Sequence, residues 1–346
     1  MLKSTSLLLL CAPPSEITVQ SISDIYGDSL INAITTSKKL SVVTDLVVAV
    51  DWPLLYGRLS TPRAQIFRDA QKLLGCLYCA LHLICIKFNS ALDPNLPGSV
   101  DARIIMLDCS SEYNNDVKPE LSKNGPLFYL QDLVHAPHAW KEIFYMDNTE
   151  GRILYHKFLE IKRQKSNLIP THVTCGTVVS DQLTFINSNT SSGAIHSVVA
   201  VGGTFDHLHA GHKLLLTAMA LLLQRSTNSP SNLRLIIGIT GDELLKNKKF
   251  AEFMRSWEHR QEDVVEFILA ILSFSTPAQK DIVQSLSYYQ PGEKNRIVQT
   301  RIEPLSILIE CIEIQDPFGP TISDQEITAL VVSSESRSGG NAVNQR

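Results

Sequence analysis

The sequence predicts an α/β protein made of two domains. Apolar segments of strand length alternate with longer segments whose apolar residues recur at helical spacing, and this alternation indicates parallel sheets with helical crossovers. The length of 346 residues suits two domains of ordinary size. A tract of small polar residues, 187–194, predicts a flexible linker. We therefore expect an N-terminal α/β domain over residues 1–186 and a second domain over residues 195–346.

Composition and charge exclude several classes of protein. Hydrophobic residues make up 44% of the chain and charged residues 19%, a balance that excludes a disordered chain. The formal net charge of −4 provides no basic excess for a nucleic-acid partner. The longest apolar run, 73–86, falls short of the roughly 20 residues of a membrane span. Seven scattered cysteines predict free thiols in the cytoplasm, not a disulfide framework.

The first half contains regular elements but no pattern that carries chemistry. The expected strands are 6–11, 45–50 and 103–107, and the expected helices are 22–38 and 62–87. The apolar start of the chain is interpreted as the first strand and not as a signal peptide. No glycine-rich phosphate loop occurs in this half, and Pro137 makes the segment His135–His138 a solvated loop rather than a metal site. The sequence therefore assigns no role to the N-terminal domain.

The second half opens with a strand, a glycine-containing loop, a helix and another strand. The expected strands are 197–201 and 233–239, the helix is 213–224, and the loop is Gly202-Gly203-Thr204-Phe205-Asp206-His207-Leu208-His209-Ala210-Gly211-His212. In an open parallel sheet, ligands bind outside the carboxyl ends of the strands. This loop therefore lies where a ligand is expected.

The residues of this loop suit an anion. Gly202 and Gly203 allow a phosphate to approach the backbone, and Thr204 adds a hydroxyl and an amide. His209 and His212 are three residues apart, so both imidazoles can point to one place at the start of the following helix, where the helix dipole favours negative charge. A polyphosphate clamp is the interpretation we favour, and a turn with incidental histidines is the alternative.

The loop resembles the signature of the His-x-Gly-His nucleotidyltransferase superfamily. Within it, residues 201–213 resemble the eukaryotic, fungal-type phosphopantetheine adenylyltransferases. Three more segments resemble that family in the same order: the lysine-bearing loop 238–249, the Asp-Pro-aromatic-Gly-Pro element 316–321, and the closing phosphate-binding element 331–344. The resemblance implies a Rossmann-like nucleotidyltransferase domain over 195–346 that transfers AMP from ATP to 4′-phosphopantetheine. It also implies Mg²⁺ as a companion of ATP, with no metal bound by the protein itself.

The resemblance implies roles for individual residues. Thr204 is expected to hold the attacking phosphate, and His212, with His209 beside it, to bind the ATP phosphates. Lys248 is expected to neutralise the anions, with Lys246 and Lys249 as rivals. The expected catalytic residues are thus His212, Thr204 and Lys248. The expected substrate contacts are Gly202, Gly203, Thr204, Phe205, His209, His212, Lys246, Lys249, Arg260, Ser333, Ser334 and Arg337, with Ser333 and Ser334 at the start of a helix. A solvated lysine loop and surface ion pairs of the two arginines are the alternatives.

Two segments depart from the family pattern. Residues 275–298 are interpreted as a polar loop inserted before the strand 308–314, and the family usually continues into a further C-terminal helix, so we expect a chain that stops one helix early. No kinase phosphate-binding loop occurs, so a single activity is expected.

The resemblance implies ATP, 4′-phosphopantetheine and other enzymes of coenzyme A synthesis as partners. The net charge and the short apolar runs add the expectation of no nucleic-acid and no membrane partner. The alternatives in function are another cytidylyl- or adenylyltransferase of the superfamily, or a non-catalytic scaffold subunit that retains the fold.

Overall fold

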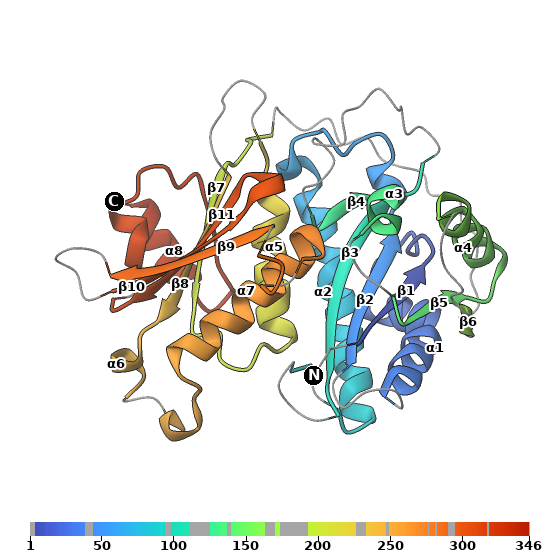
Figure 1. The fold of residues 1–346 in the computed structure, drawn as a ribbon, viewed down its shortest axis with the longest axis horizontal. Coiled ribbons are helices and arrows are strands. Elements are labelled where there is room, and N and C mark those ends of the chain that lie inside the picture. The colour runs from blue at the N-terminus through green and yellow to red at the C-terminus, as the bar shows by residue number, and fades with distance from the viewer. Residues whose placement is uncertain are drawn as a thin grey trace. The chain divides into compact units, whose positions relative to one another are not determined.

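The chain forms two compact units in the computed structural model (Figure 1). The structure describes residues 4–38, 44–90, 92–93, 98–110, 125–136, 140–162, 170–173, 193–225, 233–246, 249–275, 277–280, 282–289, 295–316 and 318–345. The first unit comprises Met1–Thr61 and Arg68–Ser191, and the second comprises Pro62–Phe67 and Ser192–Arg346. Of the expected linker, only residues 193 and 194 lie within the described part of the chain.

The first unit is built on a six-stranded parallel sheet with the strand order β4-β3-β2-β1-β5-β6. Its strands are β1 (Ser4–Leu10), β2 (Thr44–Asp51), β3 (Val100–Asp108), β4 (Leu127–Tyr129), β5 (Glu142–Met146) and β6 (Pro170–Val173). Its helices are α1 (Val19–Lys38), α3 (Leu130–Val134), α4 (Thr149–Ile161) and, from Arg68 onwards, α2 (Arg63–Lys87). The central strands β1 and β2 consist largely of apolar residues, as is typical of a parallel sheet that helices cover on both faces. The expected α/β class is confirmed, although no individual strand or helix of this unit after β3 had been predicted.

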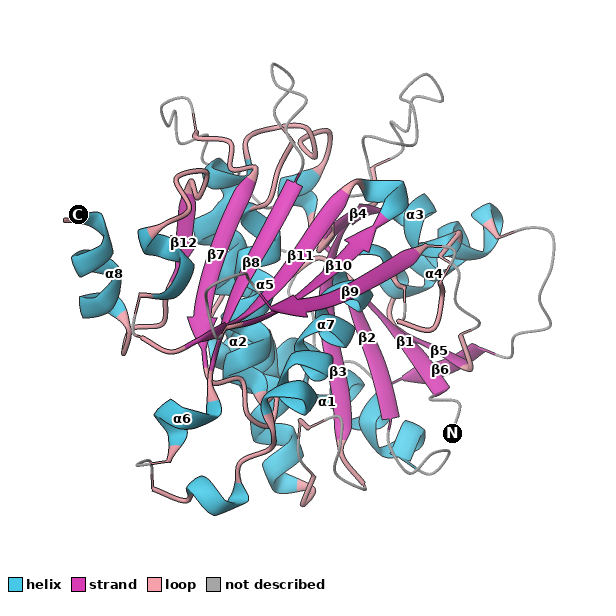
Figure 2. Ribbon diagram, turned by 60° about the vertical axis from the view of Figure 1, so that its left-hand side comes forward, coloured by secondary structure: helices cyan, strands magenta, loops and turns pink. Residues whose placement is uncertain are grey.

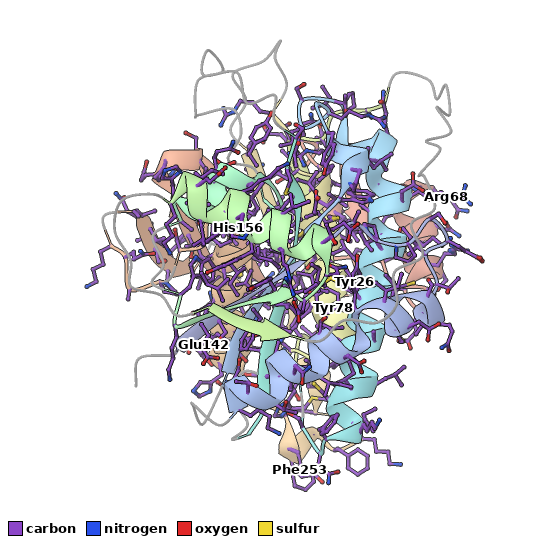
Figure 3. The ribbon with its side chains drawn as sticks, turned by 90° about the vertical axis from the view of Figure 1, so that its right-hand side faces the viewer. Tyr26, Arg68, Tyr78, Glu142, His156 and Phe253 are labelled. Atoms are coloured by element: carbon purple, nitrogen blue, oxygen red, sulfur yellow. The ribbon has the colours of Figure 1, made fainter. Side chains whose placement is uncertain are left out.

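Helix α2 is the longest helix of the described residues. By length and composition it is long and apolar enough to cross a membrane, contrary to the expectation that no apolar segment reaches that length, and half of its most apolar stretch is buried inside the protein. Tyr26 on α1 and Tyr78 on α2, both labelled in Figure 3, lie in the interior of the first unit. The hydroxyl of Tyr26 donates to the carbonyl of Cys11 at 2.7 Å, so the buried polar group is satisfied.

The second unit contains a mixed six-stranded sheet with the order β12-β7-β8-β11-β10-β9 (Figure 2). Its strands are β7 (Val198–Gly203), β8 (Leu233–Thr240), β9 (Val283–Tyr289), β10 (Arg296–Ile302), β11 (Ile307–Ile314) and β12 (Ala329–Val331). Its helices are α5 (Ala210–Leu222), α6 (Asp242–Leu245), α7 (Trp257–Ser273) and α8 (Arg337–Asn344). The strands β12, β7, β8 and β11 are parallel, which confirms the expected parallel core. Short 3₁₀ helices occur at Pro53–Leu55 in the first unit and at Ala251–Phe253, Glu303–Leu305 and Gly319–Ile322 in the second.

The expectation of a loop over 275–298 is wrong. Strands β9 and β10 form an antiparallel hairpin there, and β10 pairs with β11 to extend the sheet. Pro291 and Gly292, residue types typical of a loop, fall between the two strands in the sequence and lie outside the described residues. The β9 sequence carries β-branched and aromatic residues that favour a strand, but most of its side chains are exposed, so it gave little apolar signal.

The register of the central strands places the ends of three elements at one edge of the sheet. Gly202 pairs with Gly238 across β7 and β8, and Thr240 at the end of β8 pairs with Ile314 at the end of β11. The segments that follow β7, β8 and β11 therefore begin side by side, and that edge carries the candidate site.

Candidate functional site

The segment that joins β7 to α5 brings the two histidines of the loop together. Helix α5 begins at Ala210, earlier than expected, so His209 is its N-cap and His212 lies in its first turn. The Nδ1 atom of His209 accepts a hydrogen bond from the backbone N–H of Gly211 at 3.1 Å. The two imidazole rings stack with their centroids 4.0 Å apart and their planes inclined by 27°. The spacing of the histidines thus produces one imidazole pair at the positive end of a helix.

Phe205 holds this segment in an unusual conformation. Phe205 and His207 have φ angles of 52° and 46°, in the left-handed region that non-glycine residues rarely adopt. The Phe205 side chain is fully buried, and its ring centroid lies 5.4 Å from that of His212. A Cβ atom at Gly203 would lie 3.1 Å from the Phe205 ring, so the glycine makes room for it. Phe205 was expected to contact a substrate. Its buried ring instead anchors the loop from inside the protein.

The environment of His212 keeps its imidazole neutral. Burial, and then the neighbouring His209, lower the pKa of His212 to about 4, although the backbone of His207 and the carboxylate of Asp206 oppose that shift. The Nδ1 atom of His212 is buried and has no hydrogen-bond partner among the described residues. A neutral imidazole near a helix N-terminus can donate one N–H to an anion, and a bound anion would in turn favour its protonation.

Two threonine hydroxyls meet where β7 and β8 end. The Oγ1 atoms of Thr204 and Thr240 are 3.5 Å apart, and the hydroxyl of Thr240 also donates to the carbonyl of Gly203 at 3.2 Å. Thr240 was not among the expected site residues. Its place at the end of the neighbouring parallel strand is the signal that could have identified it.

Arg260 is placed differently from the expectation of a phosphate contact. Its side chain is fully buried. Its guanidinium donates to the carbonyls of Thr204, Thr240 and Arg255 and to the carboxylate of Asp242, at distances from 2.7 to 3.0 Å. All three guanidinium nitrogens are thus engaged inside the protein. The expectation is revised, because a buried guanidinium with these partners cannot also present itself to a phosphate.

A cavity of about 280 Å³ adjoins the loop. Its walls come from β7, the ends of β8 and β11, the segment after β11, β12, α6 and α8. The lining residues are Ala200, Val201, Gly202, Gly203, Gly238, Thr240, Leu244, Ile314, Asp316, Phe318, Pro320, Thr321, Leu330, Val332, Ser336, Gly339, Gly340 and Val343. None of these is a cation, and the carboxylate of Asp316 accepts hydrogen bonds from the backbone N–H groups of Phe318 and Gly319. The cavity therefore suits an uncharged group rather than a phosphate.

Neither Lys246 nor Lys249 is among the residues that line this cavity. Lys246 ends α6 and pairs with Glu243 at 2.6 Å, and Lys249 lies with its Nζ 4.9 Å from the centroid of the Phe250 ring. Lys248, the lysine favoured on sequence, lies outside the described residues. Which lysine contacts a phosphate therefore stays a prediction.

The serines of the closing element do not begin a helix. Helix α8 begins at Arg337, which is exposed, and Ser333 and Ser334 lie in the turn before it. The Oγ of Ser333 accepts a hydrogen bond from the backbone N–H of Ser336 at 3.3 Å. The expected position of the two serines at a helix start is therefore wrong by a few residues. Ser336, which the sequence analysis did not single out, is the serine of this segment that lines the cavity.

The described part of the chain contains no group of three or more His, Cys, Asp or Glu side chains placed to hold a metal ion. The second unit thus combines a largely parallel sheet, an imidazole pair at a helix start and an adjoining cavity without cations. Residues 200–336 match the family described as Cytidylyltransferase-like, and residues 1–181 match a domain of unknown function, DUF8446. The chain therefore belongs to the DUF8446 family through its first half and to the cytidylyltransferase-like nucleotidyltransferases through its second.

Several individual proteins are similar to parts of this chain. The chain is 34% identical over 148 residues to a phosphopantetheine adenylyltransferase of Saccharomyces cerevisiae, covering 43% of this chain and 35% of the yeast protein. It is 41% identical over 151 residues to a protein of the same name from Thermococcus gammatolerans, covering 39% of this chain and 89% of the archaeal protein. An uncharacterized protein of Schizosaccharomyces pombe is 32% identical over 209 residues, which are 60% of this chain and 52% of that protein. The chain thus spans about half or less of these two fungal relatives. No solved structure matches it.

Proposed function

We propose that the second unit transfers an adenylyl group from ATP to 4′-phosphopantetheine and releases dephospho-coenzyme A and pyrophosphate. The observation that carries this proposal is the loop from Gly202 to His212, which sets two stacked imidazoles at the start of α5 beside a cavity without cations. The relatives that bear the name of this activity support the choice of substrates within the nucleotidyltransferases.

The charges of the site suggest where each part of ATP would bind, the nucleoside in the cavity and the phosphates at the start of α5. The cavity offers glycine backbone, apolar side chains and hydroxyls, so it would take the uncharged nucleoside. The start of α5, with His209 and His212, would take the phosphates, because backbone N–H groups and the helix dipole favour anions there. Mg²⁺ would arrive on the phosphate oxygens of ATP.

The chemistry needs positioning more than it needs a base. An oxygen of the acceptor phosphate, already ionised near neutral pH, would attack the α-phosphorus. The bond from that phosphorus to the bridging oxygen would break, and the electron pair would leave with pyrophosphate. His212 would donate its N–H to the charge that develops on the α-phosphate, and the Thr204 hydroxyl would orient the attacking phosphate. A lysine of 246–249, with Lys248 favoured on sequence, would neutralise the phosphates.

The test is a direct assay of the purified full-length chain with ATP, Mg²⁺ and 4′-phosphopantetheine. We expect equal amounts of pyrophosphate and dephospho-coenzyme A, measured by coupled absorbance and by mass spectrometry. Parallel reactions replace ATP with CTP and the acceptor with other phosphate monoesters, including nicotinamide mononucleotide. Product only with another nucleotide or acceptor would overturn the proposed substrates, and no product with any pair would favour a scaffold subunit.

A further inference from the structure

We propose that Arg260 is a positioning residue for the transfer reaction, because its buried guanidinium fixes the segments after β7 and β8 relative to each other. The proposal rests on the proposed function for its kinetic consequence, but its structural content concerns this chain alone. The residue would touch neither substrate and would act through Thr204 and Thr240.

The contacts of Arg260 connect four separate points around the site. One guanidinium nitrogen donates to the carbonyl of Thr204 at 2.7 Å. A second donates to the carbonyl of Thr240 and to the carboxylate of Asp242, both at 2.9 Å. The Nε donates to the carbonyl of Arg255 at 3.0 Å. One side chain on α7 thus holds the loop after β7, the end of β8 and the start of α6.

A second route leads from the same guanidinium to the histidine loop. The backbone N–H of Arg255, whose carbonyl accepts from Arg260, donates to the carboxylate of Asp206 at 3.1 Å. Arg260 therefore restrains the loop directly at Thr204 and indirectly at Asp206. These two anchors flank Phe205, the first of the two left-handed residues of the loop. A strained backbone persists only where its surroundings hold it, and these hydrogen bonds supply part of that restraint.

The guanidinium of Arg260 suits this task better than a shorter side chain or one with a single cationic nitrogen would. A buried guanidinium is costly unless hydrogen bonds satisfy it, and here three carbonyls and one carboxylate do so. Its donors form a rigid planar fork, whereas a lysine ammonium is a single point and cannot reach all of these oxygens together. Three of the four acceptors are backbone carbonyls, so a change at Arg260 moves backbone rather than one side chain.

The expected consequence is a loss of alignment between the Thr204 hydroxyl and the nucleotide. The Oγ1 atoms of Thr204 and Thr240 are 3.5 Å apart, and both segments are held by the same guanidinium. A misplacement of about 1 Å in a reacting group can lower turnover about a hundredfold. Removal of Arg260 should therefore reduce kcat far more than it weakens ATP binding.

The test compares Arg260→Met, Arg260→Lys and Asp242→Asn with a matched control, Arg234→Met. Arg234 on β8 is also a largely buried arginine of the second unit, and it pairs with Glu310 and Asp324 at 2.6 and 2.8 Å. We expect kcat to fall about ten- to a hundredfold in Arg260→Met while the KM for ATP changes less than about threefold. Arg260→Lys should restore part of the loss, and Asp242→Asn should have the smallest effect because the three carbonyl contacts remain. Arg234→Met should lower stability and leave kcat of the folded protein near the wild-type value.

A second measurement keeps the inference independent of activity. Hydrogen exchange of the free protein at 25 °C should show faster exchange over residues 203–212 and 240–245 in Arg260→Met, and no such change there in Arg234→Met. If the wild-type chain fails to transfer an adenylyl group yet this exchange pattern appears, the proposed function falls and the positioning of the loop by Arg260 stands. Unchanged exchange over these segments, or an Arg260→Met enzyme with wild-type kcat, would overturn the positioning role. If Arg260→Met does not fold, Arg260→Lys and Asp242→Asn carry the same comparison.

Discussion

The neutral imidazole of His212 predicts a specific dependence of stability on pH. Its pKa is lowered from the ordinary 6.5 to about 4, first by burial and then by His209. Below pH 6.5 the unfolded chain takes up a proton at this residue and the folded chain does not. The free energy of unfolding therefore falls as the pH drops from about 6.5 towards about 4. Above pH 6.5 the imidazole is neutral in both states and His212 causes no such loss.

The size of the effect follows from the two pKa values. Each unit of pKa difference corresponds to about 1.4 kcal/mol, and at pH 5 the unfolded imidazole is almost fully protonated while the folded one is not, which gives about 2 kcal/mol of lost stability. His212→Gln removes the titrating group and keeps a polar side chain of similar reach. Relative to this variant, the wild-type free energy of unfolding should fall by about 2 kcal/mol between pH 8 and pH 5.

The measurement is hydrogen exchange of the buried β7 and β8 amides between pH 5 and pH 8, which reports on the second unit alone. The same substitution at the exposed His259 controls for the loss of a surface imidazole. Direct titration of the His212 ring by NMR gives the pKa itself, and added ATP should raise it, since phosphates favour the imidazolium. Wild-type and His212→Gln free energies that run parallel over this range would refute the reasoning, and so would a ring pKa near 6.5.

Two further predictions concern other parts of the chain. A Cβ at Gly202 would meet no atom within 4 Å, whereas one at Gly203 would lie 3.1 Å from the Phe205 ring. Gly202→Val should thus keep the wild-type Tm and raise the KM for ATP at least about tenfold, which corresponds to a loss of about 1.4 kcal/mol of binding free energy. Gly203→Val should instead lower the Tm. A Gly202→Val enzyme with unchanged KM for ATP would contradict this placement of the nucleotide. In the first unit, burial is the main cause that raises the pKa of Asp51, so the folded state disfavours its charge and loses stability as the pH rises through that raised value. Asp51→Asn should therefore gain stability over the wild type between pH 4 and pH 7 in urea unfolding, and an equal difference at both pH values would disprove it.

The loop of the second unit shows how far local sequence could lead. Glycines after a β-branched strand, followed by two histidines three residues apart, predicted an anion site at a helix start because the rules involved are local. The same rules predicted the parallel strands 6–11, 45–50 and 197–201, since buried parallel strands are continuous apolar runs. They failed for β9 and for β6, because few apolar residues occur in these strands. Each forms a strand by pairing with a neighbouring strand, β10 and β5 respectively.

The sequence by itself determined the class of the protein, the α/β architecture and the segment that carries the candidate site. Only the tertiary structure decided what each residue does there. Arg260, an expected phosphate contact, is buried and donates a hydrogen bond to the carbonyl of Thr204 instead, and the Phe205 side chain lies inside the protein. The tertiary structure also brought Thr240 and Ser336 to the cavity. The reason is physical: burial, the pKa of His212 and the partners of a guanidinium depend on groups distant in the chain, and no local pattern of residues encodes those distances.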